Sequence, residues 1–448
     1  MVMPLQIASN NTVGQVPPTL FTSNVPASFG SSGFAFIGPV CAVFVYPSGH
    51  VQAVFRAGAT HVSAGDYGVI QVADSYDGGA TWQSAITILS ENRIDLRNVG
   101  GGVLPDGRAI LGVGRYNPDT GTWLSLDVWA SDDEGVTWAR TNQFLAGQIP
   151  GSQGYSGFSW NQKLIPLGSN TFGIPWYEAS GTSSSALHIM KTQDRGQSWS
   201  DILIVNTTTA QYNQPLEHTV VHIGGGRMVC VARTGNPTGH MWWFTSSNGG
   251  TTWTSIGNMD SLDSGSSSMT MDVELIEDAA GPDPWVLLTW NNASANTIKY
   301  VLGRGATLVA GALDWTFFPA TTLSINSTYA GNGTVRFYRG STRGIYVNTG
   351  NETGLKLRGQ NVIPHSKTPK GVLAITVGGS PFTYTNNDLV PEMVYISGGT
   401  LTTPFVRKNG ITIFGVSNVG VFLWPGEFVT VTYSAAPTMT KDLKWSTG

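Results

Sequence analysis

One eight-residue motif occurs four times in this chain and constrains its fold more than any other feature. The motif reads S/T-x-D/N-x-G-x-S/T-W, and its copies are residues 75–82 (SYDGGATW), 131–138 (SDDEGVTW), 192–199 (TQDRGQSW) and 246–253 (SSNGGTTW). The tryptophans at 82, 138, 199 and 253 are spaced by 56, 61 and 54 residues, and a further step of 62 reaches Trp315 in a degenerate fifth copy. Four copies in register indicate an internal repeat.

The residue types of the motif predict a tight turn between two strands. The aspartate or asparagine accepts backbone hydrogen bonds across the turn, and the glycine adopts a conformation that side chains forbid. The hydroxyl caps the turn, and the tryptophan inserts between neighbouring sheets. The residues with these predicted structural roles are Asp77, Trp82, Asp133, Trp138, Asp194, Trp199, Asn248 and Trp253.

The period of the repeat predicts the architecture. Helical patterning is nearly absent, and a period of 54–62 residues holds four strands of about 5–6 residues with their turns. Four-stranded units repeated radially form a β-propeller. We predict an all-β chain: an extended arm at residues 1–30, a six-bladed β-propeller at 31–358 and a C-terminal β-sandwich at 359–448. Strands at 334–338 and 344–347, with residues 34–37, would complete the sixth blade.

Composition excludes several classes of function. Lysine and arginine number 24 against 28 aspartates and glutamates, a net charge of −4, and they form no basic run, so no nucleic-acid partner is expected. No apolar run approaches the ~18–20 residues of a membrane span, and no lysine or arginine precedes Arg56, so no signal peptide is expected. Cys41 and Cys230 lie in apolar runs and are predicted to be buried thiols without a disulfide.

The repeated motif resembles the Asp box, or BNR repeat, of sialidase-type propellers over roughly residues 31–358. Separately, residues 380–386 (SPFTYTN) and 433–440 (YSAAPTMT) resemble the ends of bacteriophage tail and fibre proteins. The second resemblance implies a virion protein of the phage tail. Its implied partners are a host-surface glycan, other tail proteins and further copies of the chain, without a membrane or a cofactor.

The sialidase resemblance also implies site residues. That family uses three arginines for the substrate carboxylate, an aspartate acid/base, and a tyrosine nucleophile activated by a glutamate. The matching positions are Asp66 (acid/base), Glu217 (activator), Tyr329 (nucleophile) and Arg233 (one of the three arginines). The structural alternatives are a turn aspartate, a buried Glu217–Arg233 ion pair and an ordinary tyrosine at a strand end.

The arginine set departs from the family pattern. Ile37 occupies the slot of the first arginine, and residues 291–296 (NNASAN) offer amides where another is expected. Arg56 is a candidate substitute, as is Arg304. With one matching arginine, most of the paired guanidinium hydrogen bonds that select a carboxylate are missing. Hydrolysis of an ordinary sialoside is therefore not expected.

A neutral sugar is a further possibility. Glu178, paired with Glu217 or Asp66, could supply the two carboxylates of a glycosidase. Trp176 is a candidate sugar-stacking face, with core packing as its alternative role. The seven histidines show no ligand spacing, so no metal is expected. The leading hypothesis is a glycan-binding virion protein; the alternatives are an active exo-glycosidase of the sialidase superfamily and a purely structural propeller.

Overall fold

The computed structural model contains only β-strands as regular elements in the residues that it describes. These are 27–29, 36–60, 63–77, 81–168, 170–182, 184–207, 214–224, 226–235, 240–259, 262, 271–277, 285–292, 297–304, 321–325, 330–337, 344–350, 356–362, 373–386, 392–408, 411–414, 419–423 and 427–442. No helix occurs among them. The prediction of an all-β chain is confirmed.

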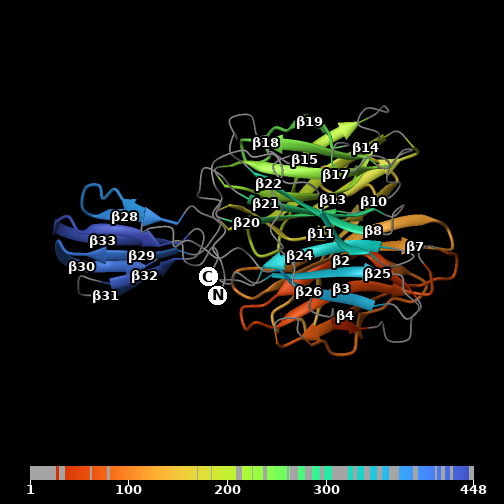
Figure 1. Cartoon of the computed structure of the whole chain (residues 1–448), viewed down its shortest axis with the longest axis horizontal. Coiled ribbons are helices and arrows are strands. Elements are labelled where there is room, and N and C mark those ends of the chain that lie inside the picture. The colour runs from red at the N-terminus through yellow and green to blue at the C-terminus, as the bar shows by residue number, and fades with distance from the viewer. Residues whose placement is uncertain are drawn as a thin grey trace.

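Between residues 27 and 362, the described strands form six sheets, in which all neighbours are antiparallel except β11 and β6 (Figure 1). The first sheet holds β2 (Phe36–Val45), β3 (Val51–Gly58), β4 (Val69–Ser75) and β5 (Ile86–Leu89). The second holds β6 (Asp95–Val103), β7 (Ala109–Asn117), β8 (Thr122–Ser131), β9 (Ala139–Leu145) and β11 (Gln162–Lys163). The third holds β10 (Gly157–Trp160), β12 (Ile165–Gly168), β13 (Thr171–Ser180), β14 (Ser184–Thr192) and β15 (Ser200–Thr207).

The remaining three sheets have four strands each. The fourth sheet holds β16 (Pro215–His222), β17 (Met228–Thr234), β18 (Met241–Ser246) and β19 (Thr254–Asn258). The fifth holds β20 (Met271–Glu277), β21 (Trp285–Asn292), β22 (Thr297–Arg304) and β23 (Thr321–Ile325). The sixth holds β24 (Ala330–Phe337), β25 (Gly344–Gly350), β26 (Lys356–Val362) and β1 (Ala27–Phe29).

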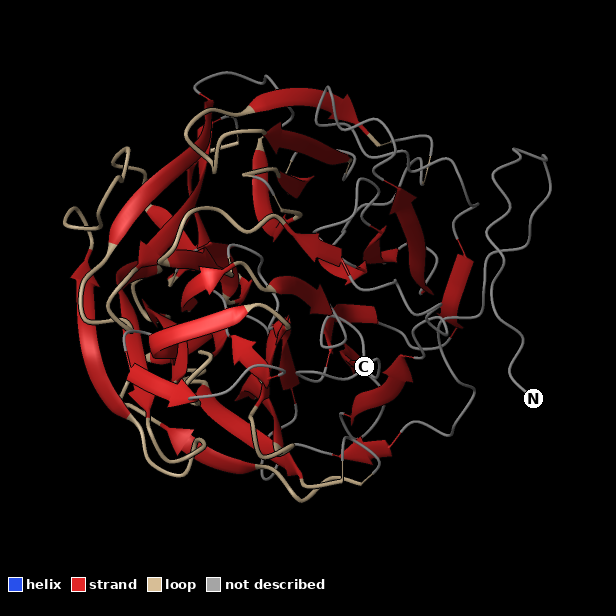
Figure 2. Cartoon of the chain, turned by 90° about the vertical axis from the view of Figure 1, so that its left-hand side faces the viewer, coloured by secondary structure: helices blue, strands red, loops and turns tan. Residues whose placement is uncertain are grey.

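These sheets contact one another in cyclic order. Strand β2 contacts β6, β8 contacts β10, β13 contacts β16, β16 contacts β20, β20 contacts β24, and β24 returns to β2. Figure 2 shows the same strands from a second direction. Each sheet therefore packs on the next along the chain, and the sixth packs on the first.

The sixth sheet joins the two ends of this region. Ala27 of β1 pairs with Gly359 of β26. The prediction that residues 34–37 complete this sheet needs correction, because Ile37 lies in β2 and pairs with Ala57 of the first sheet; residues 34 and 35 are not among those described. Strand β1 lies within the predicted arm, and β26 crosses the predicted limit at residue 358. Pairing with β1 satisfies backbone groups that β26 would otherwise leave exposed at a sheet edge.

The predicted hydrogen bonds of the repeat motif are present at the turns β4–β5, β8–β9, β14–β15 and β18–β19. In the second copy, Asp133 accepts the backbone N–H of Thr137 at 2.9 Å and its hydroxyl at 2.6 Å, and Ser131 Oγ accepts the N–H of Gly135 at 2.8 Å. Gly135 has a φ of +82°, which explains the glycine. Asp77 and Asp194 accept the same two hydrogen bonds from the residue four positions later. Asn248 accepts the backbone N–H of Thr252 at 2.9 Å but donates its side-chain amide to the Thr252 hydroxyl at 2.9 Å.

Three of the four tryptophans of the motif, Trp138, Trp199 and Trp253, insert between neighbouring sheets as predicted, whereas Trp82 packs against a core cluster of the first sheet. Trp138 donates its indole N–H to Gly135 O at 3.0 Å and packs on Phe44, with 6.0 Å between ring centroids. It thereby connects the second sheet to the core of the first. Trp199 packs in the hydrophobic core between the second and third sheets, and Trp253 packs in the hydrophobic core between the third and fourth sheets.

Asp194→Ala should lower stability without changing any site at the other ends of the strands. Hydrogen bonds from Ser198 lower the pKa of Asp194 to about 2. The stabilisation is therefore present above pH 3.8 and is lost as the pH falls through about 2. We expect a loss of about 1–2 kcal/mol near neutral pH in thermal melts. Asp132→Ala, which removes an aspartate whose side chain is 63% exposed, is the control; equal losses in both variants would contradict the turn-locking role.

A buried lysine connects distant sheets. Lys163 of β11 lies 3.0 Å from Asp272 Oδ1 and 2.6 Å from Glu274 Oε2 of β20. Thr219 of β16 donates its hydroxyl to Asp272 at 3.0 Å. This network joins the second, fourth and fifth sheets through side chains alone.

Residues 373–442 form two further four-stranded sheets, at the left of Figure 1. One holds β27 (Leu373–Ile375), β34 (Thr438–Asp442), β29 (Glu392–Ser397) and β32 (Val419–Leu423). The other holds β28 (Phe382–Thr385), β33 (Phe428–Ala435), β30 (Thr400–Lys408) and β31 (Ile411–Phe414). Buried residues of both sheets, including Val394 and Val429, share one core.

Candidate functional site

The candidate residues gather at the strand ends opposite the Asp boxes. Asp66 lies in the β3–β4 loop and Arg56 near the end of β3, whereas the Asp box of the same sheet follows β4. Glu217 lies near the start of β16, and Arg233 near the end of β17. We call the following residues the charged cluster: Arg56, Asp66, Asp95, Arg97, Tyr177, Glu217 and Arg233.

Arg56 is the most enclosed arginine of the cluster. Its side chain is 2% exposed, and its Nε donates to Asp95 Oδ1 at 2.6 Å. Its Nη2 lies 3.1 Å from Asp66 Oδ2, and its Nη1 donates to Thr60 O at 2.8 Å. A Cβ at Gly68 would lie 2.5 Å from Arg56 Nε, so the backbone approach at Gly68 requires glycine. Arg56 therefore holds two carboxylates rather than presenting a bare guanidinium.

Asp66 is saturated by its own loop. Its oxygens accept the N–H groups of Ala59 at 2.9 Å and Thr60 at 2.8 Å, besides the Thr60 hydroxyl and Arg56. Burial works to raise the pKa of Asp66, but these hydrogen bonds and the charge of Arg56 outweigh it and lower the pKa. Asp66 is thus held ionised, which disfavours the general-acid role that the sialidase resemblance implies.

Arg97 was not among the sequence candidates. It follows Asp95 on β6, is 7% exposed, and approaches the Asp95 carboxylate only to 3.8 Å. Its guanidinium lies over the rings of Tyr116 and Trp123 at 5.3 and 5.7 Å, and its Nε has no hydrogen-bond partner. Burial lowers its pKa. The sequence signal that could have identified Arg97 is its place two residues after Asp95. In the structure, Arg97 lies near the start of β6, just before the bulge between Arg97 and Gly100.

Tyr177, Glu217 and Arg233 form the other half of the cluster. Arg233 Nε donates to Glu217 Oε2, which realises the ion pair that the sequence analysis left as the alternative. Tyr177 is half-buried beside them; desolvation raises its pKa, and the charge of Glu217 adds to the rise. The positive charges of Arg233 and Arg97 act on the same phenol in the opposite sense. Tyr177 was not among the sequence candidates.

The charges of the cluster balance. Three guanidiniums, from Arg56, Arg97 and Arg233, face three carboxylates, from Asp66, Asp95 and Glu217. Guanidiniums that are already paired with carboxylates have fewer free N–H groups for the bidentate binding of a substrate carboxylate. This set therefore fits a ligand with many hydroxyl groups better than a carboxylate.

Glu178 and Trp176 lie in the core of the third sheet. Both are 0% exposed. Glu178 accepts hydrogen bonds from Ser152 Oγ at 2.7 Å and Tyr155 N at 3.1 Å, in the loop that covers it. The Trp176 ring stacks on His188, with 4.1 Å between centroids. Neither residue has the exposed surface that its predicted role in sugar contact requires, because the β9–β10 loop and β14 cover them.

Raising the pH should destabilise the protein through His188. Burial opposes the charge on this histidine, but Asp201 at 2.9 Å and Glu178 at 3.3 Å outweigh burial and raise its pKa above 6.5. The stabilisation is complete below pH 6.5 and is lost as the pH rises through the raised pKa. Thermal melts between pH 5 and 9 should show this loss in the wild type and a flatter profile for His188→Gln. Parallel profiles would contradict the assignment.

Several sequence candidates lie outside the described residues: Tyr329, Trp315 and residues 293–296. Cys41 and Cys230 are buried and form no disulfide, as predicted. Across the described ranges, no group of three or more His, Cys, Asp or Glu side chains is placed to hold a metal ion. The described part of the chain also has no helix that is long and apolar enough to cross a membrane.

Comparisons with known proteins agree with this geometry. The family model "BNR repeat-like domain" matches residues 113–276. The chain has a sialidase-type fold. It superimposes on the NanB sialidase of Streptococcus pneumoniae with a TM-score of 0.58 at 13% identity, covering 77% of this chain and 70% of that one. A protein of unknown function from Dyadobacter fermentans gives 0.60 at 14% identity, with 78% and 100% covered. A Trypanosoma rangeli sialidase gives 0.53 at 13% identity, with 93% and 84% covered. No curated protein matches.

Proposed function

We propose that the chain is a glycan-binding protein of a bacteriophage tail, with a six-bladed β-propeller followed by a β-sandwich. The cyclic contacts of the six sheets support the propeller, because radial packing closes only if the last unit meets the first. The shared core of the two C-terminal sheets supports the sandwich. The charged cluster then lies at the mouth of the propeller, the common position of ligand sites between repeated units.

The carboxylates of Asp66 and Glu217 already have partners within the protein, and this observation favours binding over hydrolysis. Asp66 is held ionised by its loop and Arg56, and Glu217 is bound by Arg233. A general acid must carry a proton near the working pH. Arg97 retains a buried Nε without a partner, which a sugar hydroxyl or ring oxygen could accept from.

A glycan array with a paired hydrolysis assay tests this proposal. We expect the full chain to retain a subset of glycans and to release them intact. Arg97→Gln should weaken that binding about tenfold, the scale of one lost charge-assisted contact. Asp194→Asn, in an Asp box at the opposite strand ends, is the matched control and should leave binding unchanged. Failure of every array glycan to bind, or equal binding by Arg97→Gln, would contradict the mouth assignment.

The virion role is supported by the two segments that resemble phage tail proteins. In the structure these segments meet, since Tyr433 N donates to Ser380 Oγ at 2.8 Å. The proposal includes contacts with other tail proteins and self-association of the chain. Immunogold labelling of purified virions with an antibody to the chain should mark the tail, and absence of label from intact and disrupted virions would contradict the role.

An exo-glycosidase is the second candidate, favoured by Tyr177 beside Glu217. A half-buried phenol with a raised pKa needs a base to act as a nucleophile, and Glu217 is the neighbouring carboxylate. If the chain cleaves a sugar through this pair, Tyr177→Phe and Glu217→Gln should reduce kcat by similar factors, with little further loss in the double variant. Fully multiplicative losses would show that the two side chains act separately.

A further inference from the structure

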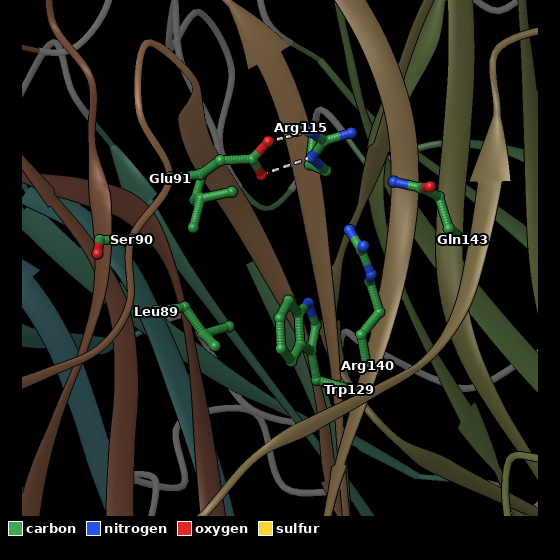
Figure 3. Close-up of a pocket in the computed structure, with 8 residues that line it drawn as sticks. Leu89, Ser90, Glu91, Arg115, Trp129, Arg140 and Gln143 are labelled. Carbon is green, nitrogen blue, oxygen red and sulfur yellow. Dashed lines mark hydrogen bonds and ion pairs between the residues drawn. The ribbon is translucent and has the colours of Figure 1, made fainter.

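A cavity of about 340 Å³ lies between the first and second sheets (Figure 3). Leu96 of β6 lines it. Because side chains alternate along a strand, the neighbours of Leu96, Asp95 and Arg97, point to the opposite face of the second sheet. The cavity is therefore separate from the charged cluster.

One wall of the cavity is apolar. It is formed by Trp129 of β8 with Leu89 and Leu96, and all three pack against the same core cluster. Trp129 is only half-buried, so part of its indole remains available. Figure 3 shows the indole beside Leu89, below the polar groups of Glu91 and Arg115. A half-buried tryptophan over a cavity is a stacking platform for an apolar ring face.

The rim of the cavity carries donors and acceptors. Arg115 binds both oxygens of Glu91, with its Nε 2.9 Å from Glu91 Oε2. Arg140 and Gln143 of β9 lie on the other side and point toward the same space (Figure 3). The Arg140 guanidinium also lies over the Trp129 ring, 5.7 Å from its centroid, so a sugar would share the indole with this side chain.

A buried carboxylate holds the rim in place. Asp127 is 1% exposed and accepts hydrogen bonds from Arg140 at 3.0 Å and from Gln143 at 3.3 Å. Ser125 donates its hydroxyl to Asp127 at 2.7 Å and so fixes the carboxylate. Support of this kind lowers the entropic cost of binding, because the rim side chains are ordered before a ligand arrives.

The charges select the class of ligand. Glu91 neutralises Arg115 and Asp127 neutralises Arg140, so an anion entering the cavity would compete with an existing ion pair. A sugar ring has an apolar face for Trp129 and hydroxyl groups that donate to Glu91 and accept from Arg140 and Gln143. We propose that this cavity is a second saccharide-binding site, separate from the mouth, that takes one neutral pyranose unit stacked on Trp129.

Calorimetric titration of the full chain with methyl glycosides tests the site. The panel is the methyl glycosides of glucose, galactose, mannose and N-acetylglucosamine, with methyl glucuronide as the anionic comparison. For the tightest neutral glycoside, Trp129→Ala should raise Kd about tenfold or more, as expected for loss of a central aromatic contact. Tyr76→Ala, which removes an exposed aromatic ring outside the cavity, should leave Kd unchanged.

Gln143→Ala provides a second variant, because Gln143 is an exposed side chain whose removal leaves the core intact. It should raise Kd several-fold in the folded protein. The proposal is overturned if no neutral glycoside binds, if the glucuronide binds more tightly than the neutral sugars, or if Arg97→Gln abolishes binding that Trp129→Ala and Gln143→Ala retain. The last outcome would place all sugar binding at the mouth, whereas failure of the mouth proposal alone leaves this site standing.

Discussion

Arg56→Met should destabilise the fold by about 3–5 kcal/mol, the range measured when one partner of a buried ion pair is removed. The methionine would fill similar volume, so the loss reports charge rather than a cavity. Asp95 is 1% exposed and would keep only the 3.8 Å contact with Arg97, while Asp66 would lose its guanidinium. Chemical denaturation at pH 7 measures the change.

Arg93→Met is the matched control for that variant. Arg93 also pairs with an aspartate, Asp119, at 2.5 Å, but its side chain is 69% exposed. Exposed ion pairs contribute at most about 1 kcal/mol. The burial of the arginine, rather than the presence of a pair, decides the expected difference. Equal destabilisation of the two variants would contradict the central role assigned to Arg56.

The protein should not cleave simple α-sialosides at the rate of an ordinary sialidase. The slots of two family arginines hold an isoleucine, Ile37, and an amide-rich segment, and the guanidiniums of the charged cluster are matched by carboxylates. A substrate carboxylate would have to compete with the carboxylates that already face these guanidiniums, which weakens its binding. The lowered pKa of Asp66 removes the proton donor as well.

Turnover of a fluorogenic sialoside, measured beside neutral-sugar analogues, checks this expectation. Rates at the uncatalysed background for the sialoside are the expected result, whether or not a neutral analogue is cleaved. Robust sialoside hydrolysis that Arg233→Ala abolishes would show that other arginines complete the carboxylate site. The enzyme hypothesis would then replace the binding hypothesis.

Local contacts were predictable from the sequence because their partners lie within one turn. Asp133 and Thr137 are four residues apart, and only a few residue types can form such a turn. The all-β character and the buried thiols follow from composition in the same way. Glu217 and Arg233 were also paired correctly as one alternative, because they face each other across a single hairpin.

Contacts between sheets were not predictable in this way. Arg56 meets Asp95 only because the first and second sheets pack together, and Lys163 meets Asp272 across the molecule. Glu178 looked available as a strand-end carboxylate, but the preceding loop folds over it. No periodicity in the chain encodes these distances, which depend on how the sheets are placed after each has formed.

The pairing of β1 with β26 has a consequence for biosynthesis. Ala27 leaves the ribosome early, whereas its partner Gly359 is synthesised only after five other sheets. A nascent chain that ends before residue 356 therefore carries an unpaired first strand, because its partner β26 has not been synthesised. Contacts of such long sequence separation form slowly, and exposed strand edges invite association with other chains. The pairing of β1 with β26 is therefore a late step of folding. Until it forms, the unpaired strand edge can associate with other chains.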